Sequence, residues 1–322
     1  MNTQHEDRIR DVAIVGGGSA GLSAALTLAR ARRDVTVIDG RRPRNAPAAA
    51  AHGLLGQEGV NPLELLERGR AEASSYGAHI TSADVVAASG SADTGFALRL
   101  DDDTTVRAAS LLIATGVHDE LPAIPGLAQR WGRDVVHCPY CHGWEVRGRR
   151  IGLLATGPMS AMQALLFHQW SGRMWFFPNG ITFPDDQLTK LRAVGIVLVP
   201  GEVGGVDVTD DRLTGALLAD GTRVGLDALA VPALARARID GLDGLGLNVV
   251  ENASGTVLAA DQAGRTSVAG VWAAGNVVDP GMQVVESAAN GARVAMTINT
   301  ELVFAHADRA VIDHNESEKL HA

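Results

Sequence analysis

The sequence predicts an α/β fold that contains two Rossmann-like βαβ units. Residues 11–39 and 150–177 both show the alternation of short apolar runs with a helical pattern that such units require. The chain has 322 residues, which exceeds one ordinary domain and fits two. Because 46% of the residues are hydrophobic and 20% are charged, a substantial core can form and extensive disorder is not expected.

The first βαβ unit lies close to the N-terminus. An apolar run at 11–15 predicts a strand, GGGSAG at 16–21 predicts a turn, and residues 22–32 have helical spacing. A second alternating run at 34–39 predicts a strand that ends in an acidic residue. Strand, glycine turn, helix and strand in this order form the context in which a glycine fingerprint binds a dinucleotide.

The glycines of the turn and the acid at the end of the second strand carry the chemistry of this unit. Gly16, Gly18 and Gly21 follow the G-x-G-x-x-G pattern, which permits a tight turn, close approach of the backbone to pyrophosphate and close helix–strand packing. The N-terminus of the helix then faces the phosphates. Asp39 is placed to hydrogen-bond a ribose hydroxyl group.

The rest of the first half alternates loops, one helix and strands. Residues 40–60 are rich in Arg, Pro, Ala and Gly and predict a loop. Residues 61–77 predict a helix, with Asn61 as N-cap and a proline in the first turn. Strands with polar turns are expected from 78 to 110, followed by a buried strand within 110–116.

The C-terminal part predicts two strands and a long helix. Residues 226–233 form an apolar strand pattern, and 270–280 predict a strand and a loop. A helix is expected over 283–305, in which Gly291 is tolerated. Residues 308–322 are polar and are expected to fray.

Composition excludes several classes of partner. The net charge of −9 and the pI near 5.5 do not favour nucleic acid or an anionic membrane. Residues 1–10 lack the apolar core of a secretory signal, and no apolar run approaches the roughly 20 residues that span a bilayer. A cytoplasmic location is therefore expected. In a reducing cytosol a lone cysteine pair is more often catalytic or metal-binding than a structural disulfide.

Both cysteines of the chain lie in HCPYCHGWE at 137–145, which is compatible with three chemistries. The pattern C-x-x-C-H is used for covalent haem attachment, but attachment normally belongs to exported chains. A structural zinc site needs four ligands. His137, Cys138, Cys141 and His142 offer four donors, but neighbouring residues rarely converge on one ion and there is no second cysteine pair. A metal site is therefore not expected.

A redox dithiol is the favoured interpretation of this stretch. Two residues between Cys138 and Cys141 allow a tight turn, and a following helix N-terminus would stabilise a thiolate. His137 and His142 flank the pair, and histidine has an intrinsic pKa suited to proton transfer near neutral pH.

Together these motifs resemble the low-molecular-weight thioredoxin reductase family over nearly the whole chain. The family's FAD fingerprint corresponds to GGGSAG, its second flavin motif to ATG at 114–116, and its C-terminal Ala-Ala-Gly-Asp motif to AAGN at 273–276. The resemblance implies a discontinuous FAD domain at 1–117 and 241–322. It also implies an inserted nicotinamide-type domain at 118–240 that carries the cysteines.

The resemblance implies FAD as cofactor and a set of residues that bind it. Asn276 replaces the family aspartate near the ribityl or pyrophosphate part, and Gln283 begins a helix whose N–H groups face the isoalloxazine ring. Arg44 and Asn45 are candidates for contact with adenine or the phosphates, although a solvated loop is equally compatible. His52 is a candidate neighbour of the flavin, although a structural role is favoured. The FAD set comprises Gly16, Gly18, Ser19, Ala20, Gly21, Asp39, Arg44, Asn45, Ala114, Thr115, Gly116, Gly275, Asn276, Gln283 and Val284.

The inserted unit departs from the family at its own nucleotide turn. The expected G-x-G-x-x-A is here Ala155, Gly157 and Ser160. Ala155 adds a Cβ where the turn is tight, and Pro158 removes a backbone donor that could meet phosphate.

Two further departures concern charge. The basic cluster that holds the 2′-phosphate of NADPH is missing, because no arginine or lysine lies between Arg173 and Lys190. The acid that normally follows the second cysteine is replaced by His142. Loss of NADPH binding is the favoured interpretation, and a degenerate turn that still binds NAD(P)H is the alternative.

These departures resemble the FAD-dependent dithiol oxidases of disulfide natural-product biosynthesis. The resemblance implies a small-molecule dithiol substrate, dioxygen as electron acceptor, hydrogen peroxide as product and a homodimer. Cys138 would exchange with substrate, Cys141 would lie against the flavin as a thiolate, and His142 would be the base. Trp144 is interpreted as a packing residue or as part of a hydrophobic substrate pocket. The alternatives are a disulfide reductase fed by NAD(P)H or ferredoxin, and a flavin-binding redox sensor.

Overall fold

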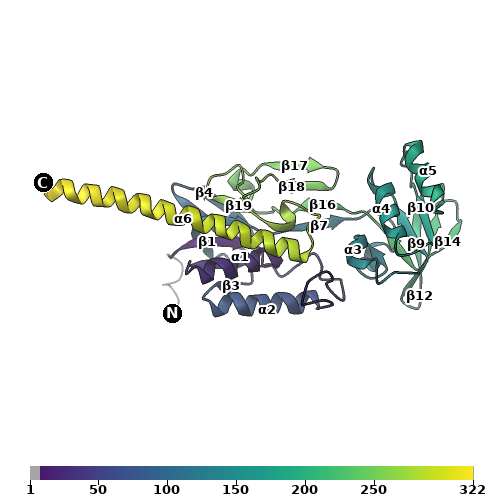
Figure 1. Ribbon diagram of the computed structural model, residues 1–322, viewed down its shortest axis with the longest axis horizontal. Coiled ribbons are helices and arrows are strands. Elements are labelled where there is room, and N and C mark those ends of the chain that lie inside the picture. The colour runs from purple at the N-terminus through teal and green to yellow at the C-terminus, as the bar shows by residue number, and fades with distance from the viewer. Residues whose placement is uncertain (1–7, 322) are drawn as a thin grey trace.

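The predicted α/β class is confirmed, and Figure 1 shows two sheet-containing units side by side. The computed structural model describes residues 8–321, with side chains described to residue 317. The unit that contains the first and last described residues includes α1 (Ser19–Arg30), α2 (Pro62–Ser75) and α6 (Val284–His321). The other contains α3 (Pro139–His142), α4 (Ser160–His168) and α5 (Asp185–Ala193). In the described part of the chain, no helix is long and apolar enough to cross a membrane.

The first unit is built on a seven-stranded sheet in the order β3-β2-β1-β6-β5-β4, with β19 also paired to β6. Strands β1, β2, β3, β6 and β19 are parallel to their neighbours in this group, whereas β4 and β5 are added antiparallel. The predicted βαβ unit is therefore confirmed as β1-α1-β2. The strands are β1 (Ile9–Val15), β2 (Val35–Ile38), β3 (His79–Thr81), β4 (Val85–Ser91), β5 (Gly95–Leu100), β6 (Thr105–Ile113) and β19 (Val271–Ala273).

Both faces of this sheet are covered, which explains why its central strands are apolar throughout rather than alternating. Val12 and Ile14 of β1 point into one core cluster with α1 and α6, while Ala13 points into the other. The predicted start of α2 is confirmed, because the side chain of Asn61 accepts hydrogen bonds from the N–H groups of Leu63 and Glu64.

The end of α6 corrects the predicted fraying. The helix was expected to end at 305, with residues 308–322 frayed, but it continues to His321 and projects beyond the body of the protein (Figure 1). The physical reason is local: no glycine or proline follows Gly291, so nothing in the sequence interrupts the backbone hydrogen bonds.

Gly291 is required in α6 rather than merely tolerated. A Cβ added at Gly291 would lie 2.1 Å from the carbonyl oxygen of Ala20 in α1, a distance that no real Cβ contact permits. The absence of a side chain lets α6 approach α1 closely, next to the first turn of the helix that follows the glycine fingerprint.

The second unit contains a parallel five-stranded sheet in the order β11-β10-β9-β15-β8. The predicted second βαβ is confirmed as β9-α4-β10. A separate antiparallel sheet, β12-β13-β14, packs in the same unit. The strands are β8 (Val135–Val136), β9 (Ile151–Leu154), β10 (Met174–Phe177), β11 (Val197–Leu198), β12 (Val203–Thr209), β13 (Arg212–Leu218), β14 (Arg223–Gly225) and β15 (Ala228–Ala230).

The chain passes between the units through two paired strands. β7 (Val117–Glu120) and β16 (Leu234–Ala237) are antiparallel to one another and belong to a four-stranded sheet with β17 (Val249–Asn252) and β18 (Gly255–Leu258). The segments near both expected domain boundaries thus lie side by side. The division into 1–117 with 241–322 and 118–240 remains a prediction.

Candidate active site

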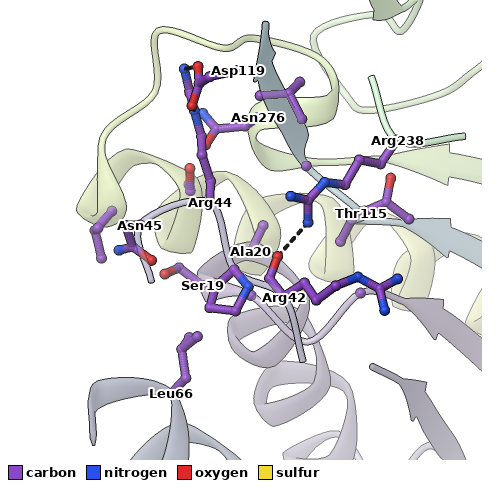
Figure 2. Close-up of a pocket in the computed structure, with 18 of the residues that line it drawn as sticks. Ser19, Ala20, Arg42, Arg44, Asn45, Leu66, Thr115, Asp119, Arg238 and Asn276 are labelled. Carbon is purple, nitrogen blue, oxygen red and sulfur yellow. Dashed lines mark hydrogen bonds and ion pairs between the residues drawn. The ribbon is translucent and has the colours of Figure 1, made fainter. Parts of the chain in front are cut away.

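A cavity of about 810 Å³ lies where the carboxyl ends of β1, β2 and β6 face the cysteine segment of the second unit. This volume is in the upper part of the range for small-molecule and cofactor sites. The cavity is lined by the glycine turn, the loop after β2, the ATG stretch, the dithiol and the start of α6. Tertiary structure therefore brings together motifs as far apart in the chain as Gly16 and Val284, of which Figure 2 shows the flavin-motif side.

The glycine turn has the geometry that a bound pyrophosphate requires. Gly16 has φ 107°, and a Cβ there would lie 2.4 Å from the carbonyl oxygen of Ala114. A Cβ at Gly21 would lie 1.9 Å from the carbonyl oxygen of Gly16, so the helix packs directly on the turn. A Cβ at Gly18 would meet nothing within 4 Å and would enter the cavity. These glycines therefore leave a backbone-lined cradle for a phosphate group.

Asp39 lines the cavity and is held by a residue that sequence reasoning missed. The side chain of Asp39 is buried; its Oδ1 accepts the N–H of Arg41 at 2.9 Å, and its Oδ2 accepts Nη2 of Arg70 at 2.8 Å. A Cβ at Gly17 would lie 2.4 Å from Oδ2. The signal for Arg70 was its position four residues after buried Leu66 in α2, on the face of the helix that turns inward.

Thr115 supplies the second sign that a ligand belongs here. Thr115 is a residue of the cavity wall, and its buried Oγ1 has no hydrogen-bond partner among the described residues. A buried hydroxyl without a partner costs free energy, which a ligand hydroxyl or phosphate oxygen would offset. Together with the cradle at Gly18, this orphaned hydroxyl shows that the residues present fit a dinucleotide such as FAD.

Arg44 has a role that the sequence did not predict. Its guanidinium group forms a bidentate ion pair with Asp119 of β7, at 2.9 and 2.7 Å, and donates to the carbonyl oxygen of Pro280 at 2.7 Å (Figure 2). Arg44 therefore ties the loop after β2 to a strand that connects the units. Asn45 lies beside it in the cavity wall. Direct contact of Arg44 or Asn45 with a cofactor stays a prediction.

Arg238 is a cavity residue that the sequence analysis missed, because nothing in its local sequence marks it. Its side chain donates to the carbonyl oxygen of Arg42, as Figure 2 shows, and its backbone N–H donates to the carbonyl oxygen of Gly116. Burial lowers the pKa of Arg238, with nearby Arg42 adding to the effect. A half-buried guanidinium group whose side-chain acceptor is a neutral carbonyl is a candidate partner for a phosphate.

The C-terminal flavin motif closes the cavity from α6. The side-chain amide of Asn276 donates to the carbonyl oxygens of Asp279 and Met282, so Asn276 shapes the loop as well as lining the cavity. Gln283 precedes α6, and its N–H donates to the Glu286 carboxylate at 2.8 Å. This N–H is thus held by a local cap, and the expectation that N–H groups at the start of α6 face a flavin ring stays a prediction. Ser19, Ala20, Ala114, Gly116 and Val284 line the cavity, whereas Gly275 packs against Ala20; their contact with a cofactor stays a prediction.

The two cysteines lie at the start of α3 in dithiol geometry. Cys138 is the N-cap: its Sγ accepts the N–H of Cys141 at 3.3 Å, and the Cys141 thiol donates to it at 2.6 Å. These hydrogen bonds, that from the Cys141 thiol first, lower the pKa of Cys138 to about 7 although burial opposes the shift. The same hydrogen bond and burial raise the pKa of Cys141.

In the reduced pair, Cys138 at the helix N-terminus is therefore the thiol that loses its proton first. Sequence reasoning assigned substrate exchange to Cys138 and the flavin-facing thiolate to Cys141. A depressed pKa suits the exchanging thiol, because the thiolate is both the nucleophile and the better leaving group. Both sulfur atoms lie in the wall of the cavity, and the assignment of Cys141 to the flavin stays a prediction.

The flanking histidines are both half-buried beside the dithiol. Burial lowers the pKa of His142, and its Nδ1 has no hydrogen-bond partner among the described residues. His142 therefore stands in the cavity as a neutral imidazole that can take up a proton. His137 is held in place instead: the N–H of Ala233 donates to its Nδ1 at 3.2 Å, and the Gln163 amide donates to its carbonyl oxygen at 2.5 Å.

The turn after β9 is closed by its own residues. The N–H groups of Thr156 and Gly157 both donate to Oγ of Ser160, at 3.1 and 3.3 Å. The Thr156 hydroxyl donates to the carbonyl oxygen of Pro232 at the end of β15. Two backbone donors that a nucleotide phosphate would need are therefore satisfied within the protein.

Trp144 corrects both interpretations offered for it. Its side chain is 65% exposed and stacks against the Arg147 guanidinium group at 4.1 Å from the ring centre. It neither packs in a core nor lines the cavity. Within residues 8–321, no group of three or more His, Cys, Asp or Glu side chains is arranged to hold a metal ion.

Comparison with known proteins agrees with this geometry. Residues 10–155 match the family described as Pyridine nucleotide-disulphide oxidoreductase. The chain is 33% identical to a thioredoxin reductase, tcpT, of Claviceps purpurea, over 83% of this chain and 86% of that protein. The solved structure of HlmI superposes with a TM-score of 0.90 at 41% identity, over 97% of this chain and 98% of that one. An oxidoreductase from Agrobacterium tumefaciens superposes with a TM-score of 0.87 at 35% identity, over 92% and 99% of the two chains.

Proposed function

This chain belongs to the thioredoxin reductase-like pyridine nucleotide-disulphide oxidoreductases, and from that premise we propose that it is an FAD-dependent dithiol oxidase. The proposed substrate is a small-molecule dithiol, and the proposed electron acceptor is dioxygen. A homodimer and a cytoplasmic location remain predictions.

The residues that would hold FAD are those of the cavity wall opposite the dithiol. Gly18 leaves room for the pyrophosphate, Thr115 offers an unpaired hydroxyl, and Arg238 offers a half-buried cation. Bound there, FAD supplies the capacity to accept two electrons from a dithiol and to pass them to dioxygen, which yields hydrogen peroxide.

One observation carries the choice of oxidase over NAD(P)H-fed reductase. In the turn after β9, Ser160 occupies the N–H groups of Thr156 and Gly157, so these donors do not face a ligand. The loop from 178 to 184 that follows β10 contains no lysine or arginine for a 2′-phosphate. The second unit thus supports the dithiol while offering little to a nicotinamide dinucleotide, which supports a substrate dithiol as the electron source.

The chemistry of the chain's own residues is thiol–disulfide exchange. A substrate thiolate attacks Sγ of Cys138 in the Cys138–Cys141 disulfide, which forms a mixed disulfide and releases the Cys141 thiolate. The second substrate thiolate attacks the substrate sulfur of that mixed disulfide, so the substrate leaves as a disulfide and Cys138 leaves as a thiolate. The substrate loses two electrons and two protons. His142, neutral and next to Cys141, takes a proton from the incoming thiol.

The source of electrons distinguishes a dithiol oxidase from a disulfide reductase that is fed by NAD(P)H. Under anaerobic conditions we expect dithiothreitol to bleach the flavin absorption of the purified protein, and micromolar NADPH to leave it unchanged over the same time. In air, dithiothreitol should yield one hydrogen peroxide per disulfide formed. Rapid bleaching by NADPH would establish a reductase instead. Bleaching by dithiothreitol without repeated peroxide formation would favour a redox sensor.

The role of His142 is expected to appear in the pH dependence. Because burial lowers the pKa of His142 below the ordinary histidine value, the imidazole is neutral at pH 7, and activity should fall only at acidic pH, once the ring becomes protonated. His142→Ala should slow anaerobic flavin reduction by dithiothreitol about 100-fold at pH 7 and abolish this acidic limb. His118→Ala, which alters an exposed histidine of β7, is the control. An unchanged pH profile in His142→Ala would remove His142 from the mechanism.

A further inference from the structure

A histidine from the first unit bridges two carboxylates next to the dithiol. Nδ1 of His52 lies 2.7 Å from Oε1 of Glu58, and Nε2 lies 3.5 Å from Oε1 of Glu145. His52 and Glu58 belong to the loop after β2, whereas Glu145 lies just beyond α3 in the second unit. The side chain of His52 is 23% exposed and lines the cavity, while Glu58 is 65% exposed. The contact between His52 and Glu145 therefore joins the two units at the mouth of the site.

The loop is built to present His52 in this position. The Ala51 N–H donates to the carbonyl oxygen of Val60, which closes the loop at its base. Inside it, Oε2 of Glu58 accepts the N–H of Gly53, while Oε1 contacts His52. Glu58 thereby holds one ring nitrogen and leaves the other directed toward the dithiol segment.

The helical turns that follow the cysteines bring Glu145 close to the reacting groups. The N–H of Gly143 donates to the carbonyl oxygen of Pro139, and that of Val146 to the carbonyl oxygen of His142, so the turns of α3 continue past residue 142. Residues four apart on such turns share a face, which places the Glu145 carboxylate beside Cys141. The pKa of Cys141 is raised mainly by its hydrogen bond to Cys138 and by burial, and Glu145 adds to this effect.

We propose that His52 is a positioning residue for the dithiol: it anchors the Glu145 carboxylate beside Cys141 and, as a donor to that carboxylate, reduces the effect of its negative charge on the thiol. The charged and titratable groups around the bridge are Glu58 on the loop, Arg44 after β2, and His137, Cys138, Cys141, His142 and Glu145 on the dithiol segment. Of these, Cys138 and Glu145 raise the pKa of Cys141, whereas Arg44 lowers it. Without the contact from His52, the Glu145 carboxylate would disfavour the Cys141 thiolate more strongly.

The test measures Cys141 directly, in flavin-loaded protein that carries Cys138→Ser so that a single thiol remains. The rate of alkylation by iodoacetamide is followed against pH, which gives the midpoint at which Cys141 becomes a thiolate. His52→Gln should raise this midpoint by about half a pH unit, equivalent to about threefold slower alkylation below it. Glu145→Gln should lower the midpoint. In protein that already carries Glu145→Gln, His52→Gln should not shift the midpoint further.

The double variant separates a charge effect from general damage. His118→Gln, which removes an exposed imidazole on β7, is the matched control and should leave the midpoint unchanged. The proposal would be overturned if His52→Gln left the alkylation midpoint unchanged or lowered it. It would also be overturned if His52→Gln shifted the midpoint equally in the presence of Glu145 and in the Glu145→Gln background. The proposal rests on the dithiol chemistry of the proposed function but not on the direction of electron flow. An NADPH-reducible flavin would therefore overturn the oxidase and leave this measurement intact.

Discussion

Replacement of Cys138 by serine is expected to abolish dithiol oxidation, with a loss of at least about 1000-fold in the rate of peroxide formation. Cys138 is the N-cap of α3 and has a pKa near 7, so it is the thiol that can exchange with substrate at neutral pH. A serine hydroxyl keeps the cap but cannot form the mixed disulfide. The measurement is dithiothreitol-dependent peroxide formation in air, together with anaerobic bleaching of the flavin band.

Cys141→Ser is the matched variant and should behave differently. It retains Cys138 but lacks the second thiol, so incubation with oxidised glutathione should produce a stable mixed disulfide between Cys138 and glutathione. Mass spectrometry would detect this adduct. The rate of alkylation of Cys138 in the reduced wild-type protein should rise with pH with a midpoint near 7, because the thiol is half ionised at its pKa. Full activity in Cys138→Ser would contradict the proposed exchange. A mixed disulfide that forms on Cys141 in Cys138→Ser, but not on Cys138 in Cys141→Ser, would reverse the two roles.

Replacement of Gly291 by valine should cause the largest loss of stability. A Cβ at this position meets the backbone of Ala20, which cannot move without shifting the first turn of α1. We expect the free energy of unfolding to fall by about 3 kcal/mol or more, as for severe overpacking in a core. The measurement is urea unfolding followed by circular dichroism, with flavin content determined on the same samples.

Ala289→Val serves as the control for Gly291→Val, because it introduces the same β-branched side chain into α6 at an exposed position. Only the intrinsic helix preference changes there, so the cost should stay below about 1 kcal/mol. Gly291→Ala should fall between the two, since it adds only the clashing Cβ. Equal stability of Gly291→Val and Ala289→Val would show that α1 and α6 can separate without cost.

Much of the fold could be predicted because its signals are local. The apolar runs, the glycine turn and the caps report backbone conformation over a few residues. β1-α1-β2, β9-α4-β10 and the Asn61 cap of α2 were confirmed in this way. The predictions that were wrong concern features that the local sequence does not specify. A polar sequence was expected to fray after 308, although nothing in it opposes a helix, and Gly291 looked tolerable because its neighbour in α1 is 271 residues away in the chain.

The candidate site shows the same division. The sequence by itself determined the chemistry available: a glycine cradle, an acid after β2, two thiols and two adjacent histidines, because these depend on residue type and spacing. Tertiary structure alone decided which groups meet. It paired Arg44 with Asp119, placed Arg238 at the cavity, and set His52 against Glu145. Such pairings depend on how distant strand ends and loops come together, and no local pattern encodes the partner of a side chain.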